Sequence, residues 1–152
     1  MRICGFNKTT LLDYPGKVAS TIFLGGCNFR CPFCQNSSLV LSPNKQPVIS
    51  TEEVLSVLKK RQGILEGVCI TGGEPTSDKE LFLLIDKIKE LGYPVKLDTN
   101  GSHPLILKKL VNNQMIDMVA MDIKSSKESY AKVSGCKNID LTSICESVEF
   151  LL

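Results

Sequence analysis

The segment GVCITGGEPTSDKELFLLIDKIKELGYPVKLDTNG, residues 67–101, contains a complete strand–helix–strand unit. Residues 67–71 and 95–99 are short, largely apolar runs next to glycine or proline, which is typical of buried strands. Between them, apolar residues recur at helical spacing over residues 81–91, after a capping pattern formed by Ser77 and Glu80. Strands joined by a helix in this way lie parallel in one sheet, with a right-handed crossover.

The same alternation continues on both sides of this unit. The run VASTIFL, residues 18–24, predicts an earlier strand, and the capping pattern of Ser50 and Glu53 predicts a helix over residues 51–62. The downstream pattern predicts a helix over 104–112, a strand over 118–124, a short helix near 127–133 and a last helix capped by Asp140. We therefore expect an α/β fold with a parallel sheet of about four βα units.

The chain of 152 residues is 43% hydrophobic, which is enough for one core and too little for two full domains. We expect a single domain over residues 1–152. The sequence stops within an apolar helical pattern, and four strands cannot close into a barrel. We expect either a fragment of a longer protein or a fold that ends as an open sheet.

The composition excludes several classes of function. A formal net charge of +2 argues against a nucleic-acid binder and against a polybasic membrane-surface protein. No apolar run approaches the ~20 residues of a membrane helix, and no secretory signal pattern is present. The 7 cysteines are an odd number and partly clustered, which favours metal ligation in a reducing compartment over a disulfide framework. We expect a cytoplasmic protein without nucleic-acid or membrane partners.

Three cysteines, Cys27, Cys31 and Cys34, follow the first predicted strand at the spacing C-x3-C-x2-C. Three thiolates on one loop indicate metal ligation, and on a [4Fe–4S] cluster they leave one iron open for chemistry. A structural zinc site is the main alternative, but zinc needs a fourth protein ligand, and none lies at a recognised zinc spacing. Phe33, next to the last cysteine, either covers a cluster, stacks on an adenine ring or packs in the core.

Glycines and an acidic residue follow the second predicted strand, as Gly72, Gly73 and Glu74. Glycines after a strand commonly only make a turn. Beside an open iron, however, the exposed backbone and the Glu74 carboxylate can receive the ammonium group of an amino-acid-like ligand, and glycine permits its close approach.

The two later strands also end in polar residues. Asp98, Thr99 and Asp122 offer hard oxygen ligands to a monovalent or divalent cation. A salt bridge from Lys124 to Asp98 or Asp122 is the alternative, and the Asn-Gly pair at 100–101 favours an Asx-type turn. Because the ligand site of a parallel α/β sheet lies at the C-terminal strand ends, we expect all of these groups on one rim.

The remaining thiols and the single histidine receive no functional role from the sequence. We interpret the cysteines outside the loop as small apolar residues or loop thiols, namely Cys4, Cys69, Cys136 and Cys145. His103 precedes Pro104, which indicates the start of a helix.

The spacing of the three cysteines, with an aromatic residue before the last, resembles that of the radical S-adenosylmethionine (SAM) enzymes. More closely, TTLLDYPGKVASTIFLGGCNFRCPFCQN at residues 9–36, with GGEPT, LDTNG and MDIK downstream, resembles the anaerobic ribonucleoside-triphosphate reductase activating proteins. It is also similar to the pyruvate formate-lyase activases. The likeness covers essentially the whole chain and implies an incomplete TIM-type radical SAM barrel.

The resemblance implies a set of ligand contacts. The three loop cysteines would hold a [4Fe–4S] cluster whose fourth iron is chelated by SAM. Gly72, Gly73 and Glu74 match the motif that binds the SAM amino group, and Lys124 matches a SAM-contacting lysine. A monovalent cation near the SAM carboxylate is implied at Asp98, Thr99, Met121 and Asp122.

The implied activity is reductive cleavage of SAM to a 5′-deoxyadenosyl radical that creates a glycyl radical on a partner enzyme, here anaerobic ribonucleotide reductase. Flavodoxin or ferredoxin would supply the electron. Longer activases continue with further βα units, and Cys4 stands where we expect a small residue such as glycine. A radical SAM enzyme with a small-molecule substrate and a non-catalytic iron–sulfur or zinc module are the alternatives.

Overall fold

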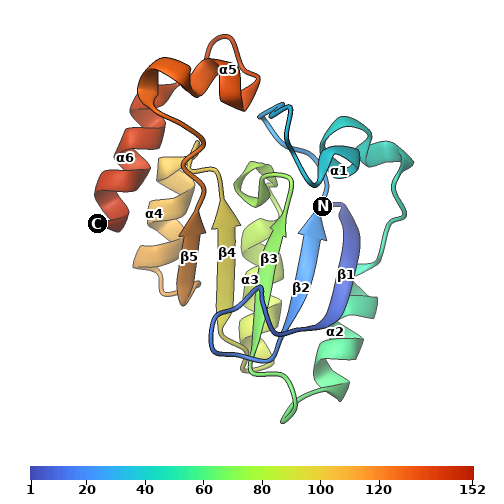
Figure 1. The fold of residues 1–152 in the computed structure, drawn as a ribbon. Coiled ribbons are helices and arrows are strands. Elements are labelled where there is room, and N and C mark those ends of the chain that lie inside the picture. Colours follow the sequence, from blue (N-terminus) through green and yellow to red (C-terminus); the bar gives the residue numbers. More distant parts are fainter.

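The computed structural model describes residues 1–152 and contains a five-stranded sheet in the order β1-β2-β3-β4-β5. Four neighbouring strands are parallel (Figure 1), namely β2 (Ala19–Leu24), β3 (Gly67–Gly72), β4 (Val95–Thr99) and β5 (Met118–Met121). Their register brings Ile22, Ile70, Leu97 and Val119 into one row across the sheet. The predicted α/β fold with four parallel strands is confirmed.

The first strand, β1 (Ile3–Thr10), pairs antiparallel with β2 and was not expected from the sequence. Its second half, which includes Asn7, Lys8 and Thr9, is exposed and polar, so no apolar run marks it. An antiparallel edge strand on an otherwise parallel sheet is common. The predicted parallel sheet therefore has one additional antiparallel strand at this edge.

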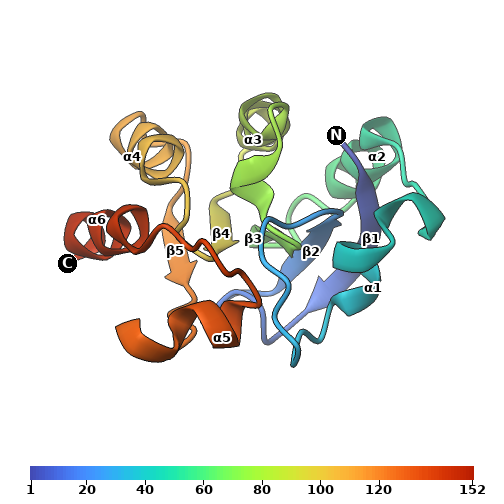
Figure 2. The ribbon, with the colours of Figure 1, turned by 90° about the horizontal axis from the view of Figure 1, so that it is seen from above.

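Three helices, α2 (Thr51–Lys60), α3 (Leu81–Glu90) and α4 (Pro104–Asn112), lie side by side along one face of the curved sheet, as Figure 2 shows. The main core lies between these helices and the strand residues that face them. It closes that face to water, so ligands have access only to the strand ends and the opposite face. None of the helices has the length and apolar character needed to span a membrane.

The helix starts agree only in part with the capping patterns. Ser50 caps α2 by accepting a hydrogen bond from the Glu53 amide at 3.1 Å, as predicted. The prediction for Ser77 is wrong, because Ser77 ends the short 3-10 helix η2 (Pro75–Ser77). Asp78 instead accepts from the Glu80 amide at 2.9 Å, one turn before α3 begins.

The C-terminal third of the chain returns to the strand ends. The 3-10 helix η3 (Lys127–Ser129) and α5 (Tyr130–Ser134) replace the single short helix expected there, and Asp140 caps α6 (Leu141–Leu151) as predicted. Strand β5 stops at Met121, so Asp122 and Lys124 lie in the following loop rather than in the strand that we predicted. The remaining short helices are α1 (Ser37–Leu41) and η1 (Pro43–Lys45).

Candidate cofactor-binding site

A cavity of about 400 Å³ opens at the C-terminal ends of the parallel strands, within the range of about 300–1,000 Å³ typical of small-molecule sites. Its wall comes mainly from the four segments that end or follow these strands, within residues 27–36, 71–73, 98–100 and 122–124. The expectation that these segments converge on one rim is confirmed. The residues that we singled out from the sequence and that line the cavity are Cys27, Cys31, Phe33, Cys34, Gly72, Gly73, Asp98, Thr99, Asp122 and Lys124.

The thiols of Cys27, Cys31 and Cys34 share this cavity and form no disulfide. Cys27 Sγ accepts a hydrogen bond from the Phe29 amide at 3.3 Å. Burial raises the pKa of both Cys27 and Cys31 above the ordinary value. Metal ligation must therefore supply the free energy that deprotonates these thiols, because only the thiolate is a good ligand.

Cys27, Cys31 and Cys34 are the only Cys or His residues that line the cavity, so the lining lacks a fourth Cys or His ligand for a closed zinc site. No three His, Cys, Asp or Glu side chains lie close enough together in this structure to hold a single metal ion. A cluster presents different irons to different thiolates. Three cysteines at one cavity match the ligand number of a cluster with one open iron.

The cysteine loop is anchored by a small second core. Phe29 is buried against Tyr130, with ring centroids 6.5 Å apart in an edge-on arrangement, and Ile144 of α6 completes the contact. The Arg30 amide donates to the Ser134 carbonyl at 2.8 Å. The loop is therefore held by a segment roughly a hundred residues away in the chain.

Gly72 and Gly73 have a steric reason to be glycine. A Cβ on Gly73 would lie 1.8 Å from the Gly26 carbonyl oxygen, and one on Gly72 would lie 2.3 Å from the Leu24 carbonyl oxygen. The Gly73 and Glu74 amides donate to these two carbonyls, both at 2.8 Å. The glycines thus let the end of β3 pack on the start of the cysteine loop.

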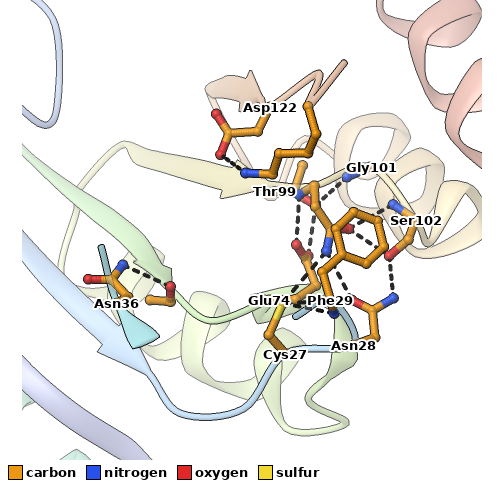
Figure 3. A network of polar contacts seen from close by, with 12 residues as sticks. Cys27, Asn28, Phe29, Asn36, Glu74, Thr99, Gly101, Ser102 and Asp122 are labelled. Atoms are coloured by element: carbon orange, nitrogen blue, oxygen red, sulfur yellow. Dashed lines mark hydrogen bonds and ion pairs between the residues drawn. The ribbon is translucent and has the colours of Figure 1, made fainter. Parts of the chain in front are cut away.

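Glu74 lies beneath the cavity wall rather than in it and is only 2% exposed. Its carboxylate accepts hydrogen bonds from the Thr76 amide and hydroxyl. It also accepts from the Thr99 hydroxyl and from the Asn100 amide, both at 2.7 Å (Figure 3). These bonds join the loops after β3 and β4. A contact between Glu74 and a ligand ammonium stays a prediction, and the geometry adds an organising role that the sequence analysis did not anticipate.

An amide network, also missed by the sequence analysis, joins the cysteine loop to the loop after β4 (Figure 3). Asn100 Nδ2 donates to Asn28 Oδ1 at 2.9 Å, and Asn28 Nδ2 donates to Ser102 Oγ at 2.8 Å. Asn100 Oδ1 accepts from the Ser102 amide at 3.0 Å, which is the Asx-type turn predicted for this segment. Asn100 Nδ2 also approaches Cys27 Sγ, at 3.8 Å.

Phe33 is 58% exposed and lines the cavity. The interpretation of Phe33 as a core residue is therefore wrong. Its exposed ring stays available to cover a cluster or to stack on a flat ligand.

Two lysine–aspartate ion pairs lie beside the cavity, and the aspartate of each lines it. Lys124 Nζ contacts Asp122 Oδ2 at 2.8 Å, which confirms the salt bridge that we weighed. Burial lowers the pKa of Lys124, but the hydrogen bond to Asp122 and the surrounding negative charges together outweigh burial, so the pKa is raised. Lys96, which the sequence analysis did not single out, is ion-paired with Asp98. The sequence contained one indication of this pair. Lys96 lies two residues before Asp98 in a strand, so both side chains point to the same face of the sheet.

The residues expected to bind a monovalent cation make contacts with the protein itself in this structure. The Thr99 hydroxyl donates to Glu74, and the Thr99 carbonyl accepts from the Asp122 amide at 2.9 Å. The Met121 side chain packs over Gly101 and does not line the cavity. The two carboxylates are each paired with a lysine. A monovalent cation at these residues stays a prediction.

The sequence profile of the radical SAM superfamily matches residues 21–152, most of the chain. The chain belongs to the radical SAM superfamily. Members of this superfamily use a [4Fe–4S] cluster and SAM, which agrees with the three thiols and the cavity beside them. The suspected resemblance is thereby confirmed.

The radical SAM chain is similar to curated proteins with different reactions. It is 35% identical to a protein of Methanocaldococcus jannaschii provisionally named a glycyl-radical enzyme activating enzyme, over 89% of this chain and 55% of that protein. It is 30% identical to a protein of Thermococcus kodakarensis provisionally named a GTP 3′,8-cyclase, over 82% of this chain and 41% of that protein. The chain thus spans about half the length of the curated relatives it matches.

A solved structure of TYW1 with a lysine-pyruvate adduct bound has the same fold as this radical SAM chain. The TM-score is 0.59 at 20% sequence identity, and the match covers 88% of this chain and 51% of TYW1. This likeness supports the fold alone.

Proposed function

We propose that this chain carries the cluster- and SAM-binding region of a glycyl-radical enzyme activase. The observation that carries the proposal is the shared cavity, where three loop thiols face the ends of β3, β4 and β5. The relative with 35% identity, named for glycyl-radical enzyme activation, supports the activase class. We further propose anaerobic ribonucleotide reductase as the partner, on the resemblance of residues 9–36, and flavodoxin or ferredoxin as the electron donor.

The residues divide the work of binding and positioning. Cys27, Cys31 and Cys34 would ligate the cluster, and the backbone at Gly72 and Gly73 would receive the amino group of SAM. Lys124, which is paired but still lines the cavity, would face the SAM carboxylate. When bound, the reduced cluster supplies the electron that cleaves SAM to methionine and a 5′-deoxyadenosyl radical.

The rim of the cavity suits a polypeptide substrate. Phe33 and Ile123 both line the cavity and are 58% and 64% exposed. These two exposed apolar side chains offer contact area to a polypeptide bound over the cavity. A glycine of the partner would be presented from this side.

The test is anaerobic reconstitution with iron and sulfide, followed by electron paramagnetic resonance with and without SAM. We expect a reduced cluster signal that shifts when SAM is added, and its loss in the Cys31→Ala variant. Adding anaerobic ribonucleotide reductase should produce a glycyl-radical doublet. A colourless zinc-bound protein would exclude the proposal.

A second candidate function is radical chemistry on a small molecule. Similarity to a named GTP 3′,8-cyclase, and to a 7-carboxy-7-deazaguanine synthase of Aquifex aeolicus at 37% identity over 53% of this chain, favours this alternative. Under it, SAM would shift the cluster signal, but no reductase would acquire a glycyl radical. The same experiment separates the two functions.

A further inference from the structure

His103, the single histidine of the chain, lies half-buried at the start of α4, next to the hydrogen bonds of Glu74. Its Nδ1 lies 2.9 Å from Thr76 Oγ1 and 3.4 Å from Ser102 Oγ. A neutral imidazole carries its hydrogen on one of its two nitrogens, so the direction of both contacts depends on the tautomer. The two hydroxyl groups decide that direction, because each has one hydrogen to donate.

The hydrogen of the Thr76 hydroxyl is already used. Thr76 Oγ1 donates to the Glu74 carboxylate. A carboxylate can only accept, and this one also accepts from the Thr76 and Asn100 amides. The Thr76 oxygen therefore presents a lone pair to His103 Nδ1.

The hydrogen of the Ser102 hydroxyl is used as well. Ser102 Oγ lies 2.6 Å from Asn100 Oδ1, and this atom is the amide oxygen because the Ser102 backbone amide donates to it at 3.0 Å. Asn100 Nδ2 donates to Asn28, and Asn28 Nδ2 donates to Ser102 Oγ at 2.8 Å (Figure 3). Ser102 therefore also presents a lone pair to His103 Nδ1, so the ring nitrogen must supply the hydrogen.

We infer that His103 is held as the Nδ1–H tautomer and is a positioning residue of the SAM site, which keeps Glu74 oriented through the Thr76 hydroxyl. The inference rests on the proposed SAM-binding function. Glu74 is buried beneath the cavity, and its carboxylate holds the amide of Asn100, a residue that lines the cavity. A change in the orientation of this carboxylate would therefore move the cavity wall at the end of β4.

The two bonds of the Thr76 hydroxyl reinforce each other. An oxygen that accepts from the ring polarises its own O–H toward the carboxylate, as in other chains of hydrogen bonds. The Nε2–H tautomer would instead set the lone pair of His103 Nδ1 against the lone pairs of two hydroxyl oxygens. Such unpaired polar groups are costly away from water.

Nitrogen-15 NMR of the full chain reads the tautomer, and a single histidine makes the assignment unambiguous. Spectra are recorded at rising pH until the ring is neutral, when its protonated and unprotonated nitrogens have distinct shifts. We expect the hydrogen on Nδ1 in the native protein and in Thr76→Ser, and a smaller Nδ1–H fraction in Thr76→Val. A hydrogen on Nε2 in the native protein would overturn the inference.

The SAM affinity of the reconstituted protein tests the positioning role. His103→Leu should bind SAM about tenfold more weakly, and its Asn100 amide should exchange with solvent faster. His103→Asn should keep most of the native affinity, because asparagine Nδ2 carries hydrogens at nearly the place of imidazole Nδ1. Gln62→Leu removes a bond to the Leu91 carbonyl, 2.9 Å long and outside the cavity lining, and should behave as the native protein.

Each contrary result has a distinct meaning. Equal losses of affinity in His103→Asn and His103→Leu would overturn the inference, as would native affinity in both. Absence of SAM binding by the native protein would instead contradict the proposed function. The tautomer and the exchange at Asn100 are measured without SAM, so they decide the inference even then. If His103→Leu does not fold, the comparison of Thr76→Val with Thr76→Ser decides it.

Discussion

At the scale of single residues, close backbone contacts and hydrogen bonds to a buried carboxylate determine the shape of the site. Gly73 lies so near the Gly26 carbonyl that no side chain fits between them. Glu74 is buried and accepts hydrogen bonds from two different loops. Replacing either residue should therefore disturb the positions of the cysteine loop and of the loop after β4 before any ligand is present.

Substitution of Gly73 by alanine should destabilise the protein by about 3 kcal/mol, because the new Cβ meets backbone that cannot move independently. Urea unfolding followed by circular dichroism measures the change. Gly5→Ala is the matched control, since its Cβ would only touch the Phe23 side chain at 3.4 Å. Equal stability losses in the two variants would contradict the steric argument.

Glu74→Gln should lower the free energy of unfolding by about 2 kcal/mol. The new amide nitrogen would face an N–H or O–H group whose hydrogen bond the carboxylate oxygen accepts in the native protein. The free energy of unfolding of the apoprotein is the measurement. In the exposed control Glu66→Gln, the retained oxygen can still accept from the Val18 amide, a bond of 2.8 Å in the native protein. A stability loss for Glu74→Gln no larger than that of the control would show that the Glu74 network contributes little.

At the scale of elements, helix starts and the small second core orient the loops around the cavity. Helix α2 begins with a side-chain cap at Ser50, whereas α3 begins without one. Helix α5 contributes Tyr130, which packs on Phe29 in the cysteine loop. Local caps and one long-range aromatic contact therefore stabilise different parts of the same rim.

Ser50→Ala should destabilise the protein by about 1 kcal/mol, since the Glu53 amide loses its acceptor. Ser77→Ala should have almost no effect, because the Ser77 side chain caps no helix. Thermal unfolding of the two variants, both at exposed positions, gives the comparison. A larger effect at Ser77 would contradict the observed start of α3.

Tyr130→Ala should destabilise the protein by about 3 kcal/mol and loosen the cysteine loop, because the buried ring is the main partner of Phe29. Hydrogen exchange at the Arg30 amide, which is bonded to Ser134, should accelerate. Tyr130→Phe keeps the ring and loses only the hydroxyl contact to the Lys124 amide at 3.3 Å, so its exchange should stay close to wild type. Unchanged exchange in Tyr130→Ala would exclude α5 as the anchor.

At the scale of the whole molecule, the helix-covered face of the sheet holds the core, and the strand ends hold the chemistry. The seven thiols follow this division. Cys27, Cys31 and Cys34 reach the cavity, while Cys69 is completely buried within β3. Burial, reinforced by the charge of Asp98, raises the pKa of Cys69 to about 12.

Alkylation with iodoacetamide should therefore separate the thiols. In the native apoprotein at mildly alkaline pH, Cys69 stays protonated and inaccessible, so it should react only when the protein unfolds. Reconstitution with iron and sulfide should protect Cys27, Cys31 and Cys34. Mass spectrometry of peptides reads each site, with the protein in guanidinium chloride as the control in which all thiols react. Rapid native labelling of Cys69 would contradict its burial.

The sequence by itself determined the order of strands and helices, the cysteine spacing and the placement of polar segments at the strand ends. These are local patterns, because periodicity, capping residues and ligand spacing are set by neighbours along the chain. The antiparallel strand β1 was not predicted, because its exposed polar half shows no alternation of apolar and polar residues.

Only the tertiary structure decided which partners the polar side chains find. Lys96 meets Asp98 and Cys69 because β3 and β4 are in register, and Thr99 turns to Glu74 because alternate residues of a strand face opposite sides. Thr99 also accepts from the Asp122 amide through its carbonyl, a contact between the ends of neighbouring strands. Burial and pairing depend on strands that the fold brings together, and a local sequence pattern does not contain that information.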